Sequence, residues 1–256
     1  MGLDPGAVDR LTVAARVRAV YAAFLARIPY ETLTNLTRGR EHPAQPEAWI
    51  RATDRLLREA STEGAGGTCF SMAYALSDLF RGVGANAHTA LGHHLRKEEP
   101  HAAAIVYQDD GPFLFDASYF VPAGIPVRPG GQVRDALFLH TLEPRRGPML
   151  TLVQQGRESP AKPLYSMIPV PAPPDAFRRA WIETCRRRLR EPTVKMARRV
   201  GNEVRWYGEE AGRIEVLDPA GRRVESPGAD LPSDLHERFG LSEALLRAHF
   251  SVGAET

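Results

Sequence analysis

The chain has 256 residues, of which 43% are hydrophobic and 25% are charged, and its formal net charge is +2. These values exclude a largely disordered chain and leave ample length for a sizeable hydrophobic core. The nearly balanced charge gives no reason to expect nucleic acid or an anionic membrane as a partner.

The cysteines and the N-terminal residues bear on the cellular compartment. Cys69 and Cys185 are too few for a disulfide framework and fit no zinc-ligand spacing, so we expect no bound metal. The first residues lack the apolar core of a signal peptide, and no apolar run reaches the length of a membrane span. We therefore predict a cytoplasmic protein with reduced thiols.

Hydrophobic periodicity predicts three helices in the first third of the chain. Apolar residues recur at helical spacing over residues 7–27, 46–60 and 69–84. Pro29 follows the first of these segments, and Pro46 suits the first turn of the second. The N-terminal part is therefore expected to be helical.

Beyond the third helix the pattern changes to short strands separated by turn residues. We expect strands at 85–92, 101–108, 112–120, 149–154 and 164–170, with a hairpin turn at "QDDGP". The C-terminal part combines a helix at 175–190, strands at 203–207, 212–217 and 222–225, and a helical pattern over 231–250. Helices, then strands, then a mixed part predict an α+β fold.

A cysteine stands at the predicted start of the third helix, in "GAGGTCF" (64–70). A thiol attacks as its thiolate, and a free thiol has a pKa of about 8.5, so a nucleophilic cysteine needs help. The unpaired N–H groups of a helix N-terminus favour an anion, and Cys69 is placed to benefit. The glycines at 66 and 67 let the backbone turn tightly and leave space for a substrate. The alternative is a buried filler residue.

Two further residues supply what a nucleophilic thiol requires. His101 begins a predicted strand, and Asp116 follows "FLF" on the neighbouring strand of the same hairpin. A histidine can take the proton of the thiol, and a carboxylate can orient that histidine. A carboxylate in an apolar strand is costly unless it is paired, so His101 is the expected partner of Asp116. The alternatives are a surface histidine and an aspartate that begins a turn.

The other histidines of this region and the second cysteine are expected at the surface. His88, His93 and His94 have no carboxylate or second thiol at metal spacing, and the "HH" pair before "RKEE" is expected in an exposed loop. Cys185 precedes three arginines and is expected on a basic, solvated helix face.

These segments resemble the arylamine N-acetyltransferases. "GGTCF" (66–70) is similar to the family's R-G-G-x-C-F segment, and "IPYETLTNL" (28–36) is similar to its I-P-F-E-N-L segment. His101 in "HAAAIV" matches the strand that bears the family's histidine, and Asp116 in "FLFDASYF" matches its D-V-G-F-G position. "DAFRRAW" and "RFGLSEALL" are similar to its C-terminal part, so the resemblance spans nearly the whole chain.

The resemblance implies a fold in three parts with a cysteine-proteinase-like core: a helical bundle over 1–84, an antiparallel β-barrel over 85–174 and an α/β lid over 175–256. It also implies a Cys-His-Asp triad and a ping-pong reaction that moves an acyl group, typically acetyl, from an acyl-CoA to a small amine. The implied catalytic residues are Cys69, His101 and Asp116. Tyr30 and Tyr119 match aromatic positions near the family's acceptor pocket, with core packing as the alternative, and Phe120 is expected beside them as a further substrate-binding residue.

The sequence departs from the family pattern close to these residues. Ala65 stands where the family has arginine, Ser71 stands where glutamate commonly follows C-F, and Ser118 and Phe120 replace two glycines. A bulky Phe120 is expected to narrow the mouth of the site.

These departures leave other functions open. An amide synthase or a hydrolytic, transglutaminase-like relative would keep the three residues and use another donor, such as a thioester on an acyl carrier protein. A binding protein without activity would keep only the fold. The basic residues over 178–199 could contact coenzyme phosphates, a carrier protein or nucleic acid, or form a solvated helix face.

Overall fold

The computed structural model describes residues 11–95, 99–157 and 159–250. Contacts divide the chain into two units, one formed by Met1–Leu25 and Cys69–Trp181 and the other by Ala26–Thr68 and Ile182–Thr256. We call them unit 1 and unit 2. The division into parts at 1–84, 85–174 and 175–256 stays a prediction.

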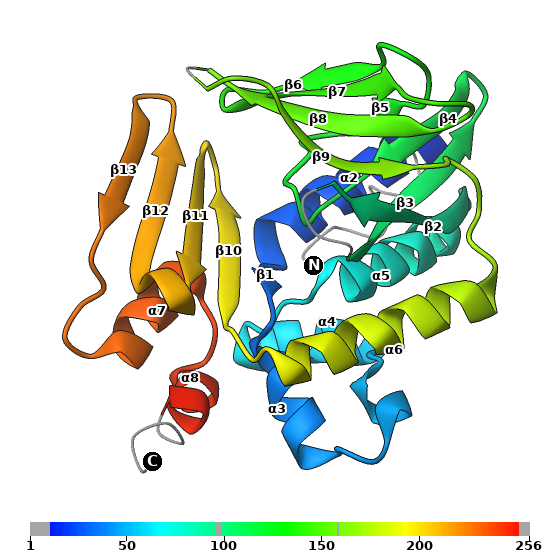
Figure 1. Cartoon of the computed structure of the whole chain (residues 1–256). Helices are drawn as coiled ribbons and strands as arrows, with labels where there is room; N and C mark the ends of the chain where they lie inside the picture. Colours follow the sequence, from blue (N-terminus) through cyan, green and yellow to red (C-terminus); the bar gives the residue numbers. More distant parts are fainter. Residues whose placement is uncertain (1–10, 96–98, 158, 251–256) are drawn as a thin grey trace. The chain divides into compact units, whose positions relative to one another are not determined.

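Unit 1 contains an eight-stranded antiparallel sheet with the strand order β5-β4-β3-β2-β9-β8-β7-β6 (Figure 1). The two edge strands, β5 and β6, approach each other, so the sheet forms a nearly closed barrel. Its core is aliphatic and includes Ile105, Leu114 and Leu152. The strands are β2 (Asn86–His94), β3 (Pro100–Gln108), β4 (Gly111–Phe115), β5 (Ile125–Pro126), β6 (Gln132–Arg134), β7 (Phe138–Pro144), β8 (Leu150–Gly156) and β9 (Lys162–Met167).

Helices α2 (Val13–Arg27), α5 (Cys69–Gly82) and α6 (Pro174–Arg190) contribute to unit 1. Helix α5 packs on β2 and β3 (Figure 1). Tyr21 of α2 fills the space between α5 and the sheet: its ring contacts Phe80 and Phe115, and its hydroxyl donates to the Val121 carbonyl at 2.6 Å. Burying this ring is favourable because its polar end has a partner.

Unit 2 contains a five-stranded antiparallel sheet with the order β1-β10-β11-β12-β13. An aliphatic and aromatic core that includes Met196, Ile214 and Phe239 holds the sheet and helices together. The strands are β1 (Tyr30–Glu31), β10 (Lys195–Val200), β11 (Glu203–Gly208), β12 (Arg213–Asp218) and β13 (Gly221–Glu225), and the helices are α3 (Leu33–Glu41), η1 (Pro46–Trp49), α4 (Thr53–Glu63), η2 (Glu209–Ala211), α7 (Leu231–Phe239) and α8 (Glu243–Phe250).

The predicted fold class, α+β with helices, an antiparallel barrel and a mixed C-terminal part, is confirmed. The single helix predicted over 46–60 is wrong, because Ile50 and Ala52 are extended and separate η1 from α4. The helical pattern over 231–250 is interrupted at Gly240, which adopts a φ of 77°. The strands β1, β5, β6, β7 and β10 and the helix α3 were not predicted. Within the described ranges, no helix has the length and apolar character needed to cross a membrane.

The basic segment over 178–199 is not one helix face. Helix α6 ends at Arg190, and Arg198 lies on β10, where its guanidinium donates to the Phe239 carbonyl at 2.8 Å. The solvated position expected for Cys185 is also wrong. Its thiol is buried and accepts a hydrogen bond from the Asn35 amide at 3.6 Å, because this face of α6 packs within unit 2.

The strand predicted over 112–120 ends at Phe115 because Asp116 begins a tight turn. Its carboxylate accepts hydrogen bonds from the backbone N–H groups of Ser118 and Tyr119, an arrangement that competes with continued strand pairing. The Val121 N–H then donates to the Asp116 carbonyl at 3.1 Å and closes the turn. Phe120 takes a φ of 53°, the one positive φ among the described non-glycine residues. This conformation costs an aromatic residue roughly 1–2 kcal/mol.

Alanine at a buried position usually gives a more stable protein than glycine, and we expect the left-handed backbone at Phe120 to reverse this order of stability. Phe120→Gly and Phe120→Ala both lose the buried ring, but glycine has no steric penalty at positive φ, so Phe120→Gly is expected to be more stable by about 1 kcal/mol. Urea unfolding of the two variants measures this difference.

Ala117, three residues earlier and also buried, provides the matched control. Its φ is negative, so Ala117→Gly is expected to lower the free energy of unfolding by about 0.5–1 kcal/mol. Equal stability of the two Phe120 variants would contradict the strain assigned to this turn.

Candidate functional site

Cys69 is the first residue of α5, and its thiol is buried. The backbone N–H groups of this first helical turn lack partners within the helix, and the helix dipole adds positive potential at the same end. Both effects favour the thiolate over the thiol. The predicted placement of Cys69 at a helix start is therefore confirmed.

His101 and Asp116 meet as expected from the hairpin. β3 and β4 pair with Ala104 opposite Phe115, so the residue just beyond β4 lies near the start of β3. His101 Nε2 is 2.8 Å from Asp116 Oδ2, and both side chains are only 1% exposed. A charge-assisted hydrogen bond at this distance is strong because no water competes for either atom.

The Asp116 carboxylate has partners on both oxygens. While Oδ2 faces His101, Oδ1 accepts hydrogen bonds from the Ser118 N–H at 3.0 Å and the Ser118 hydroxyl at 2.7 Å. Burial disfavours the charged form, but the charge of His101 and the hydrogen bonds from His101 and Ser118 hold the pKa of Asp116 below its ordinary value. Ser118, a departure from the family pattern, thus adds a donor to this carboxylate.

His101 is held as an imidazolium. Burial by itself lowers its pKa, but the charges of Asp116 and Cys69 and hydrogen bonds to both outweigh burial and raise the pKa to about 10. Cys69, His101 and Asp116 therefore interact as one electrostatic group inside unit 1. A thiol beside an imidazolium that a carboxylate orients is the arrangement required of an activated cysteine nucleophile.

Three aromatic rings surround the His101 imidazole. The ring centroid of Tyr165 on β9 lies 4.1 Å away, that of His94 at the end of β2 lies 4.9 Å away, and that of Tyr119 lies 5.3 Å away. Burial, followed by the charge of Asp116, raises the pKa of Tyr165, so this residue stays neutral. The exposed loop expected for His94 is wrong, because β2 extends to this residue and turns its ring toward His101.

The remaining predicted binding residues lie in different surroundings. Tyr119 contacts His101 directly, whereas Phe120 is buried in the turn after Asp116. Tyr30 belongs to unit 2, where β1 pairs with β10 and the Arg188 guanidinium donates to the Tyr30 hydroxyl at 3.2 Å. Their roles in binding stay predictions.

The glycines before Cys69 have a packing role. A Cβ atom on Gly66 would overlap the Pro29 carbonyl, which also accepts a hydrogen bond from the Gly67 N–H at 3.0 Å. The Gly67 carbonyl in turn accepts from the Glu31 N–H at 3.1 Å. The space expected for a substrate beside Gly66 is therefore occupied by the chain itself.

A buried guanidinium contacts the glycine segment that follows Ala65. The side chain of Arg51 is fully buried in unit 2, and it donates to the Gly66 carbonyl. It also pairs with Glu59 at 3.0 Å and with the fully buried Glu31 at 3.5 Å. Glu31 accepts a further hydrogen bond from the Thr34 N–H at 2.8 Å. Sequence inspection could not find Arg51, because its sequence surroundings are those of an ordinary helix.

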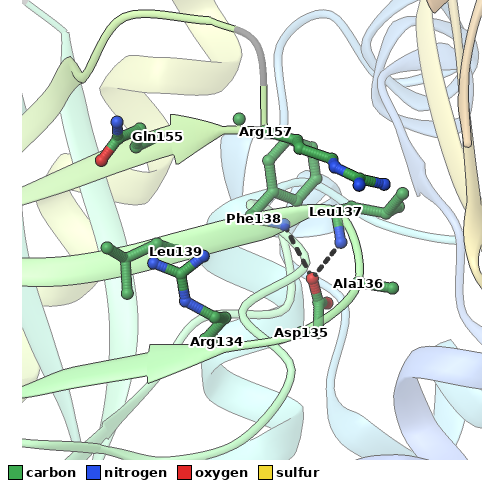
Figure 2. Close-up of a pocket in the computed structure, with 9 residues that line it drawn as sticks. Arg134, Asp135, Ala136, Leu137, Phe138, Leu139, Gln155 and Arg157 are labelled. Atoms are coloured by element: carbon green, nitrogen blue, oxygen red, sulfur yellow. Dashed lines mark hydrogen bonds between the residues drawn. The ribbon is translucent and has the colours of Figure 1, made fainter. Parts of the chain in front are cut away.

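A hollow of about 240 Å³ lies at the end of the β6–β7 hairpin (Figure 2). The Asp135 carboxylate there accepts hydrogen bonds from the N–H groups of Leu137 and Phe138 at 2.8 Å each, which shapes the loop. Arg134 and Arg157 are also among its lining residues. None of Cys69, His101 and Asp116 lines this hollow. Among the described residues, no three His, Cys, Asp or Glu side chains are grouped so that they could hold a metal ion.

Comparison with solved structures shows that the fold is a known one. An arylamine N-acetyltransferase from Mycobacterium smegmatis matches with a TM-score of 0.75 and 17% sequence identity over 91% of this chain and 90% of the other. The chain has the arylamine N-acetyltransferase fold. The Mycobacterium marinum enzyme in complex with CoA matches with a TM-score of 0.74 and 14% identity over 94% of both chains.

A third structure with this fold is an arylamine N-acetyltransferase from Bacillus cereus, described as having a unique Cys-His-Glu catalytic triad. It matches with a TM-score of 0.71 and 13% identity over 91% of this chain and 93% of the other. A scan against protein-family models gave no match, and a search of curated proteins gave no significant match. The arylamine N-acetyltransferase resemblance found in the sequence is thus confirmed at the level of the fold.

We expect Asp116→Asn to lower the pKa of His101 from about 10 by roughly 1–3, because the variant removes the anion that most favours the imidazolium. Titration of the histidine side chains by NMR measures this change. Ser118→Ala, which removes one donor and leaves the carboxylate, is the matched control and should shift the His101 pKa much less. Equal effects of the two substitutions would contradict the assignment.

The same pair should make stability depend on pH. A raised His101 pKa stabilises the fold fully below its ordinary value of 6.5 and progressively less as the pH rises toward about 10. A lowered Asp116 pKa stabilises the fold above its ordinary value of 3.8 and is lost at more acidic pH. The difference in unfolding free energy between the wild type and Asp116→Asn is therefore expected to be largest between about pH 4 and pH 6.5.

We expect Arg51→Met to lower the free energy of unfolding by about 3–5 kcal/mol, because it leaves the buried Glu31 carboxylate without its cation. Urea unfolding measures the loss. Arg58→Met is the matched control: Arg58 is a highly exposed α4 arginine paired with Asp54, and its loss should cost less than about 1 kcal/mol. Similar losses in both variants would contradict the buried network.

Proposed function

We propose that the protein is an acyltransferase that moves an acyl group, acetyl in the simplest case, from a CoA thioester through a Cys69 thioester to a small amine. The observation that carries the proposal is the buried group of Cys69, His101 and Asp116 within an arylamine N-acetyltransferase fold. The complex of the Mycobacterium marinum relative with CoA supports a CoA thioester as the donor.

In the first half-reaction the Cys69 thiolate attacks the carbonyl carbon of the acyl-CoA. The tetrahedral intermediate collapses with cleavage of the bond to the CoA sulfur, and His101 gives its proton to the departing CoA thiolate. We assign the Cys69 N–H, in the first turn of α5, as one donor to the oxyanion. The products are acyl-Cys69, neutral His101 and free CoA.

In the second half-reaction an amine attacks the acyl-Cys69 carbonyl. His101 takes the proton that the amine nitrogen loses, and the Cys69 thiolate leaves as the amide forms. Asp116 keeps the ring orientation fixed and stabilises the imidazolium in both directions. The resting thiolate and imidazolium are restored, so the enzyme returns to its starting state after the second half-reaction, as a ping-pong reaction requires.

Intact-mass spectrometry after incubation with acetyl-CoA tests the proposal. We expect one added acetyl group on the wild type and on Cys185→Ser, and none on Cys69→Ser, because the thiol at the start of α5 interacts with His101. Addition of an arylamine should remove the acetyl group and release the amide. Cys69→Ser should lower turnover by ~10³-fold or more.

The outcome also separates the alternative functions. Acylation by a carrier-bound thioester but not by acetyl-CoA would replace the donor in this proposal, and loss of the acetyl group to water without an amine would indicate a hydrolase. No thioester with either donor would reject the acyltransferase proposal.

A further inference from the structure

A second histidine lies beside His101, on the strand that precedes it. His94 is the last residue of β2 and is paired with Tyr165 on β9, and its ring is inclined at 66° to the His101 ring. The Tyr119 hydroxyl lies 3.1 Å from His94 Nδ1. His94, Tyr119 and His101 therefore form a closed set of contacts: two through ring faces and edges, and one through a hydrogen bond.

Tyr119 is fixed at both of its ends. Its N–H donates to Asp116 at 3.3 Å, and its carbonyl accepts from the Gln154 amide at 3.5 Å, which holds the backbone. Its ring could still turn about the side-chain torsions, because Tyr119 is only partly buried. The hydrogen bond to His94 fixes the far end of that ring.

The groups that face His101 come from four parts of unit 1. They are Cys69 on α5, His94 on β2, Tyr165 on β9, and Asp116 with Tyr119 in the turn after β4. Asp116 and Cys69 both carry charge opposite to that of His101, whereas the two tyrosines present aromatic rings to it. An aromatic ring within about 6 Å of a cation is attracted to it.

We propose that His94 is a positioning residue of the acyl-transfer site. Its ring fixes the Tyr119 hydroxyl, and the Tyr119 ring then keeps the His101 imidazolium oriented toward Cys69. That the site transfers acyl groups rests on the proposed function, whereas the effect of His94 on the reactivity of the Cys69 thiol does not. We assign the Tyr119 O–H as the donor and His94 Nδ1 as the acceptor, which is the tautomer that carries its proton on Nε2.

Alkylation of Cys69 by iodoacetamide tests this inference without requiring acyl transfer. The background is Cys185→Ser, which leaves Cys69 as the one thiol, and the rate is measured from pH 6 to pH 9. We expect His94→Leu and Tyr119→Phe each to slow alkylation at pH 6 by about two- to tenfold, because each removes one hydrogen bond. The effect should shrink toward pH 9, where any thiol is increasingly ionised.

The pair and its matched controls distinguish positioning from packing. The double variant should be no slower than either single variant, since both break the same contact. His94→Asn, whose amide oxygen can accept from Tyr119, should restore the rate. His93→Leu, on the exposed neighbouring residue of β2, should leave it unchanged.

Additive effects, no restoration by asparagine, or equal slowing by His93→Leu would overturn the proposal. If His94→Leu fails to fold, Tyr119→Phe, which keeps the ring, carries the test by itself. A wild type that forms no thioester but shows the predicted alkylation pattern would reject the proposed function and leave the role of His94 supported.

Discussion

The site depends on a charge pair, His101 with Asp116, that is almost completely removed from water. A buried charge is costly unless its partner and its hydrogen bonds are fixed, so the surrounding structure has to hold both groups in one geometry. The hairpin of β3 and β4 brings the two residues together, and the turn after β4 supplies hydrogen-bond donors to the second oxygen of the Asp116 carboxylate. The thiol at the start of α5 then has a cation beside it.

The positions that differ from the arylamine N-acetyltransferase pattern are accommodated by local chemistry. Ser118 replaces a glycine and donates to Asp116, while Phe120 keeps a left-handed backbone that a glycine would adopt without strain. Next to Ala65, the Gly66 carbonyl accepts a hydrogen bond from the Arg51 guanidinium, which comes from another segment.

Sequence inspection could identify elements whose signal is local. The helix beginning at Cys69 and the hairpin that carries His101 follow from short-range periodicity and turn residues. The break between η1 and α4 could not be predicted, because the apolar spacing continues through it although Ile50 and Ala52, on either side of the buried Arg51, are extended. His94 was missed because a histidine before a charged run has the composition of a loop, and only strand pairing with Tyr165 reveals its position.

The sequence by itself determined the α+β class, the helix start at Cys69 and the His101–Asp116 contact, because each follows from patterns a few residues long or from one hairpin. Only the tertiary structure decided that His101 is an imidazolium, that His94 and two tyrosines surround it, and that Arg51 supports the glycine segment. The physical reason is that burial and charge partners arise between residues far apart in the chain. A local sequence pattern does not predict how exposed to water a side chain will be, or which opposite charge will contact it, once the strands have paired.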